Sequence, residues 1–66
     1  MDTQAALILE YMRNKPITPL EALRKFGSLR LGARIFELRK EGHAIDTEYV
    51  TVKGKTLARY HLREDA

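Results

Sequence analysis

The chain has 66 residues, among them 12 lysines and arginines against 9 aspartates and glutamates, which gives a net charge of +3. A chain of this length has room for one domain, residues 1–66, with a thin core and no sizeable catalytic cleft. It contains no cysteine, which excludes disulfides and thiolate zinc sites and fits a reducing compartment, so we expect a cytoplasmic protein. Because no apolar run approaches the roughly 18 residues that span a bilayer, and the N-terminus lacks a positive signal region, we expect no contact with a membrane.

The first predicted element is a helix over residues 3–14, capped by Asp2 or Thr3. Its buried stripe follows the i, i+3, i+4, i+7 spacing and contains Ala5, Ile8, Leu9 and Met12. Leu7 and Tyr11 form a second apolar pair beside this stripe. Either the C-terminal hairpin or a second copy of the chain covers the pair, so Leu7 and Tyr11 are the candidate residues for self-association.

A second helix is predicted over residues 19–26. Thr18, Pro19 and Glu21 have the spacing of a capping box, in which the hydroxyl and the carboxylate each accept a hydrogen bond from the other residue's backbone amide. Gly27 ends this helix, because glycine readily takes the positive φ of a helix terminus. The side chains expected to be buried are Leu20, Leu23 and Phe26.

A third helix is predicted over residues 29–41, followed by Gly42. Advancing 100° per residue places Leu31, Ile35 and Leu38 on one face, which must be the core face. Gly32 in the interior costs about 1 kcal/mol relative to alanine, which indicates a close approach by the preceding helix or by a nucleic-acid phosphate.

Two short helices joined at a glycine, the second rich in arginine, are typical of a helix-turn-helix, whose second helix reads base edges in the major groove of DNA. The residues expected to make these contacts are Ser28, Arg30, Ala33, Arg34 and Glu37. For Arg34 an alternative is an ion pair along the helix with Glu37 or Glu41, or across the turn with Glu21.

Residues 45–62 have the composition of two strands that turn at Lys53-Gly54. The register that follows from a two-residue turn pairs Ile45 with Leu62, Thr47 with Tyr60, and Tyr49 with Ala58, all on the face that packs on the helices. The residues expected to contact the phosphate backbone are Lys53, Lys55 and Thr56 at the tip, together with Thr18. The alternative is that the lysines only keep the tip soluble and discourage edge pairing.

No catalytic constellation is present in the sequence, and we expect neither an enzyme nor a cofactor, a metal or a small-molecule ligand. Gly54-Lys55-Thr56 matches only the end of a phosphate-binding loop, and it falls at a hairpin tip rather than before a helix. His43 and His61 have no cysteine or clustered carboxylate neighbours, and His43 suits the C-terminus of the third helix.

The stretch TPLEALRKFGSLRLGARIFELRKEG, residues 18–42, and the hairpin after it resemble the helix-turn-helix domain of small phage and prophage proteins. The resemblance covers residues 17 to about 62. It implies an α+β fold of the winged helix-turn-helix class, with three helices followed by a two-stranded antiparallel hairpin, the wing. It also implies contact with double-stranded DNA through Ser28, Arg30 and Arg34, and phosphate contact by the wing.

The charge distribution favours the same function. Residues 24–40 contain 6 basic side chains and 1 acid, and residues 51–63 contain 4 and none. We therefore expect sequence-preferring DNA binding by a small phage or mobile-element regulator, such as a repressor, a transcriptional regulator or an excisionase-like factor, acting as a homodimer or assembling cooperatively on DNA. The alternative is a protein-interaction module, for example a phage-encoded inhibitor or adaptor of a host protein.

Overall fold

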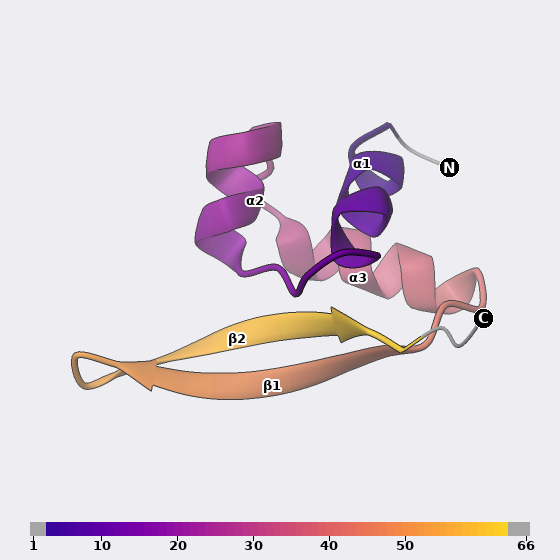
Figure 1. The fold of residues 1–66 in the computed structure, drawn as a ribbon. Coiled ribbons are helices and arrows are strands. Elements are labelled where there is room, and N and C mark those ends of the chain that lie inside the picture. Colours follow the sequence, from indigo (N-terminus) through magenta and orange to yellow (C-terminus); the bar gives the residue numbers. More distant parts are fainter. Residues whose placement is uncertain (1–2, 64–66) are drawn as a thin grey trace.

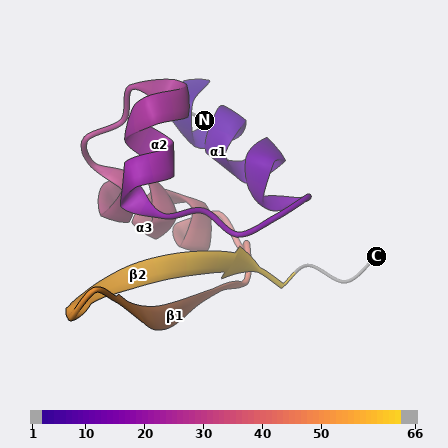
Figure 2. The ribbon, with the colours of Figure 1, turned by 60° about the vertical axis from the view of Figure 1, so that its left-hand side comes forward.

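Three short helices pack on one side of a two-stranded antiparallel hairpin, as Figure 1 shows. The computed structural model describes residues 3–63. Its elements are α1 (Thr3–Met12), α2 (Pro19–Phe26), α3 (Leu31–Lys40), β1 (Ile45–Val52) and β2 (Lys55–Leu62). In Figures 1 and 2 alike, the three helices lie on the same side of the hairpin, and α1 contacts β2 directly. The predicted fold class is confirmed, and within the described residues no helix is long and apolar enough to cross a membrane.

The core is built from one side of each helix and the base of the hairpin. The buried stripes predicted for α1 and α3 are confirmed, and the structure adds Ile17 from the connection between α1 and α2. The buried apolar residues are Ala5, Ile8, Leu9, Met12, Ile17, Ala22, Leu31, Ile35, Leu38 and Ile45.

The predicted bounds of α2 match those of the structure. The amide of Glu21 donates to Thr18 Oγ1 at 3.2 Å, and the amide of Thr18 donates to Glu21 Oε1 at 3.0 Å, so the capping box is complete. Gly27 takes a φ of 66°, and its amide donates to the carbonyl of Leu23 at 2.9 Å. Sequence signals placed both ends correctly because both are local.

The burial predicted for Leu20 and Leu23 is wrong, because their exposed fractions are 54% and 41%. α2 turns the side that contains Ala22 toward the core instead. In this orientation the carboxylate of Glu21 accepts a hydrogen bond from the Tyr11 hydroxyl of α1 at 3.3 Å. The small alanine then allows α2 to approach its neighbours closely.

α1 and α3 are shorter than predicted. α1 ends at Met12, where the amide of Asn14 bonds to the Tyr11 carbonyl in a tight last turn before Pro16. The expected cap at Asp2 lies outside the described residues. α3 begins only at Leu31, because Arg30 has the non-helical angles φ −131° and ψ 52°.

The predicted hairpin register is confirmed, with Ile45 opposite Leu62, Thr47 opposite Tyr60 and Tyr49 opposite Ala58. Lys53 and Gly54 both have positive φ, 52° and 78°, as a tight two-residue turn requires. The packing predicted for Tyr49 is wrong, since this side chain is 72% exposed. The outer half of the hairpin extends past the helices (Figure 1).

No pattern in the sequence predicts the contact that attaches the hairpin to the helices. Ile17 and Tyr60 form an isolated antiparallel bridge, with the Ile17 amide 3.0 Å from the Tyr60 carbonyl and the Tyr60 amide 2.8 Å from the Ile17 carbonyl. The Ile17 side chain is fully buried. One residue thus contributes both to the core and to a third, minimal strand beside β2.

We expect Ile17→Ala to lower the free energy of unfolding by about 2–5 kcal/mol, because it leaves a cavity between the helices and β2. Urea unfolding followed by circular dichroism measures this loss. The matched control is Leu20→Ala, which removes a similar side chain from the surface and should cost less than about 1 kcal/mol. A larger loss for Leu20→Ala than for Ile17→Ala would contradict this description of the core.

Candidate nucleic-acid interface

The solvent-facing side of α3 lies opposite the core residues of that helix. We call it the outward face of α3, and it consists of Gly32, Ala33, Phe36, Glu37 and Lys40. Gly32, Phe36 and Lys40 are exposed, and Ala33 and Glu37 are half-buried. The helix therefore presents to solvent a surface with an exposed aromatic ring, Phe36, in its middle.

Arg34 lies at the side of α3 rather than on the outward face. Its side chain is only 18% exposed, and its Nη1 lies 3.3 Å from Glu37 Oε1. This ion pair is one of the alternatives that the sequence left open for Arg34. Direct base contact by Arg34 or Glu37 stays a prediction, and it would require the pair to part.

The segment before α3 holds the two other polar residues predicted to read bases. Ser28 is buried, and its Oγ accepts a hydrogen bond from the amide of Arg30 at 3.4 Å. Arg30 itself is exposed at the N-cap position of α3. Arg30 is thus presented to a partner at the entrance of the helix, and Ser28 shapes the turn that presents it.

Arg39 connects α3 to β1 by hydrogen bonds that were not predicted from the sequence. Its Nε and Nη2 donate to the carbonyl of Ile45 at 3.1 and 2.7 Å, and Nη2 also donates to Thr47 Oγ1 at 3.0 Å. The last turn of α3 is thereby fastened to the start of β1. A positive side chain at a helix C-terminus was a recognisable signal, but its partner strand was not.

The wing tip carries the predicted backbone-contacting residues Lys53, Lys55 and Thr56, and all three are exposed. Thr18 differs, because it is half-buried and its hydroxyl is hydrogen-bonded to Glu21 in the capping box. Thr18 therefore marks the N-terminus of α2, whereas the lysines remain open to a partner.

The other cations of the wing are paired across its strands. Glu48 Oε1 lies 2.8 Å from Arg59 Nη2 and 2.6 Å from His61 Nε2, and Arg63 Nη1 lies 3.2 Å from Asp46 Oδ1. The count of basic residues over 51–63 overlooked these acids, because strand pairing brings them from β1. Hydrogen bonds from His61 and Arg59 lower the pKa of Glu48 below its ordinary value.

The two residues expected to mediate self-association differ in exposure. Leu7 is exposed, whereas Tyr11 is half-buried against α2, with its ring centroid 5.8 Å from that of Phe26 in an edge-to-face contact. α2 covers Tyr11, which was neither of the two alternatives considered from the sequence. Self-association through α1 stays a prediction, now centred on Leu7.

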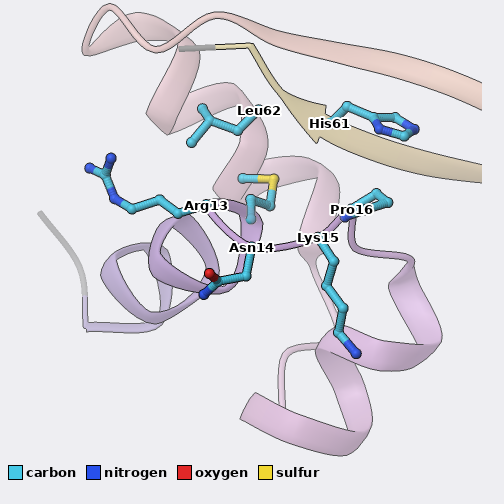
Figure 3. A pocket seen from close by; sticks show the side chains of 7 residues that line it. Arg13, Asn14, Lys15, Pro16, His61 and Leu62 are labelled. Carbon is cyan, nitrogen blue, oxygen red and sulfur yellow. The ribbon is translucent and has the colours of Figure 1, made fainter. Parts of the chain in front are cut away.

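A small cleft of about 220 Å³ lies where the end of α1 meets β2. Figure 3 shows that the polar ends of Arg13, Asn14 and Lys15 point away from one another rather than into a common space. Ligand sites of small molecules have a few converging polar groups. The cleft therefore offers no basis for proposing such a ligand.

A second hollow, of about 340 Å³, is apolar. It lies between α2, the turn before α3, and β2, and its lining residues are Pro19, Leu20, Leu23, Ser28, Leu29, Leu31 and Leu57. Because Leu29, Leu31 and Leu57 line one groove, the start of α3 and the outer part of β2 lie close together. Arg30 and the basic wing tip thus belong to neighbouring parts of the surface.

The structure resolves one alternative for Gly32. A Cβ built at this position meets nothing within 4 Å, so the neighbouring helix does not require a glycine there. The predicted close approach of α2 to Gly32 is therefore wrong. Approach by an external partner remains, since Gly32 lies on the outward face of α3.

A helix-turn-helix formed by α2 and α3, with α1 behind it and a hairpin wing after it, defines the winged helix-turn-helix fold. The model of the winged helix-turn-helix domain family matches residues 3–65. The chain belongs to this family. No curated protein and no solved structure matches the chain.

We expect the pairing of Glu48 to make stability depend on pH. Because its pKa is lowered in the folded protein, its contribution is full above the ordinary carboxyl pKa and is lost as the pH falls through the lowered value. Glu48→Gln should therefore melt below the wild type at pH 7, and the two should converge as the pH falls below the lowered pKa of Glu48. Thermal melts at several pH values measure this, with exposed Glu41→Gln as the control. An equal difference at every pH would contradict the assignment.

Proposed function

We propose that the protein binds double-stranded DNA with a sequence preference, placing α3 in the major groove and the wing along the phosphate backbone. The observation that carries this proposal is the exposure of Arg30, Lys53 and Lys55 on neighbouring parts of a winged helix-turn-helix. Arginine can bond bidentately to guanine O6 and N7, and lysine supplies a point charge to phosphate. Sequence preference is thus attributed to Arg30, and affinity to the wing tip.

A role as a regulator of a phage or mobile element fits the resemblance of residues 18–42 to small phage proteins. One α3 reads only a few base pairs, so a regulator of this size gains selectivity by placing two copies on half-sites. The exposed Leu7 on α1 supports such a contact between copies.

A protein-interaction module is the second candidate function, and the apolar groove favours it. Exposed Arg24 and Arg30 adjoin its lining residues in the chain, and exposed Lys55 lies two residues before Leu57. The groove therefore suits an apolar segment of a partner protein that is flanked by acidic side chains.

A salt titration of binding to random duplex DNA separates the two functions. Neutralising about 4 to 8 phosphates gives a slope of about −4 to −7 in log affinity against log salt concentration. Replacing Lys53 and Lys55 together with alanine should reduce the magnitude of this slope by up to about 2.

The matched control replaces Lys15 and Lys25 with alanine. Both lie over the Tyr11 ring, at 5.3 and 5.8 Å from its centroid, and their loss changes the net charge equally. This variant should keep the wild-type slope. Absence of binding at about 50 mM salt would favour the protein-interaction module.

We expect Arg30→Ala to cost about 1–3 kcal/mol on a duplex selected from a random library, and much less on random duplex, because the guanine contact is made only at the preferred site. Fluorescence anisotropy with both duplexes measures the difference. Arg24→Ala, which removes an exposed arginine from α2, is the control. Equal losses on both duplexes would assign Arg30 to phosphate instead.

A further inference from the structure

The outward face of α3 presents an aromatic ring in the place where a DNA-reading helix would be expected to present polar side chains. Phe36 is 61% exposed, although burying a phenylalanine side chain away from water is favourable. Gly32, four residues earlier on the same helix, leaves open space beside it. The ring is therefore exposed to whatever approaches this face of α3.

A cation accompanies the ring. Lys40 Nζ lies 5.5 Å from the centroid of Phe36, within the range of a cation–π contact. The two residues are four positions apart, about one helical turn, and the contact orients both side chains on the outward face. An approaching polyanion would meet the ammonium group, and the ring beside it would meet an apolar group of the same partner.

The two arginines within α3 are engaged elsewhere. Arg34 is paired with Glu37, and Arg39 fastens α3 to β1. Polar readout by this helix is thus concentrated before its first turn, at Arg30. The middle of the outward face is left with an apolar contact, and in the major groove the apolar group is the C5-methyl of thymine.

A protein partner fits this face less well. Stable protein interfaces bury about 1,200–2,000 Å² around a cluster of apolar side chains. Within α3, which the structure describes completely, Phe36 is the one exposed large apolar side chain, and basic residues occupy the last turn. A single ring beside cations matches a methyl-bearing, negatively charged groove better than an apolar protein surface.

We propose that Phe36 is a specificity-determining residue that contacts the C5-methyl group of thymine, with Lys40 placed on an adjacent phosphate. This inference rests on the proposed DNA binding and deepens it. It makes thymine, and by the same chemistry 5-methylcytosine, a preferred base beside the position read by Arg30.

The test uses deoxyuridine, which lacks only the C5-methyl group of thymidine. A preferred duplex is selected from a random library and prepared once with thymidine and once with deoxyuridine throughout. The wild type should bind the thymidine duplex about 3- to 10-fold more tightly, since each methyl group removed from water contributes about fourfold. Phe36→Ala should bind both duplexes equally and the thymidine duplex more weakly than the wild type does.

Two further variants separate the ring from its surroundings. Tyr49→Ala removes an exposed aromatic side chain from β1 and should keep the wild-type preference for thymidine. Lys40→Ala should weaken binding to both duplexes and lower the salt slope by about 1, while keeping most of the preference. The melting temperature of Phe36→Ala should stay within a few degrees of the wild type, because the ring lies at the surface.

Four outcomes would overturn the inference. A wild type that binds both duplexes equally, or a Phe36→Ala variant that keeps the preference, removes methyl reading by this ring and leaves the proposed DNA binding intact. If Phe36→Ala instead abolishes self-association in sedimentation with no change in the preference, the ring belongs to a protein interface. A wild type that binds no duplex at all contradicts the proposed function itself.

Discussion

The position of the wing depends on the pair of hydrogen bonds between Ile17 and Tyr60. A two-stranded hairpin is marginal by itself, and three strands or a helical surface are needed to hold it. Ile17 supplies both, because its backbone extends the sheet at β2 and its side chain is buried among the helices. The two backbone hydrogen bonds of Ile17 thus attach the connection between α1 and α2 to the hairpin.

Two further contacts hold the base of the wing. Arg39 binds the carbonyl of Ile45, and the amide of Arg63 donates to the carbonyl of Ala44 at 2.8 Å. The base of the wing is therefore bonded to α3, and its two chain ends are bonded to each other. The tip extends past the helices (Figure 1). This arrangement gives an interface in which α3 and the wing keep a fixed spacing while Lys53 and Lys55 reach outward.

The tertiary structure redistributes the positive charge that the sequence shows. Acids of β1 neutralise Arg59 and Arg63, Glu37 pairs with Arg34, and Arg39 is used within the fold. The basic side chains best presented to DNA are then those at the entrance of α3, at its end and at the wing tip. Between them lies Phe36, and for this reason we assign part of the base reading to an apolar contact.

The sequence by itself determined the features whose signals are local. The capping box at Thr18 and the turn at Gly27 bounded α2, the helical spacing of Leu31, Ile35 and Leu38 fixed the core side of α3, and the turn at Lys53-Gly54 set the hairpin register. Only the tertiary structure decided the rotation of α2, which exposes Leu20, the bridge at Ile17, and the partners of the arginines. These depend on residues distant in the chain, and no pattern of neighbouring residues records which strand or carboxylate will lie opposite.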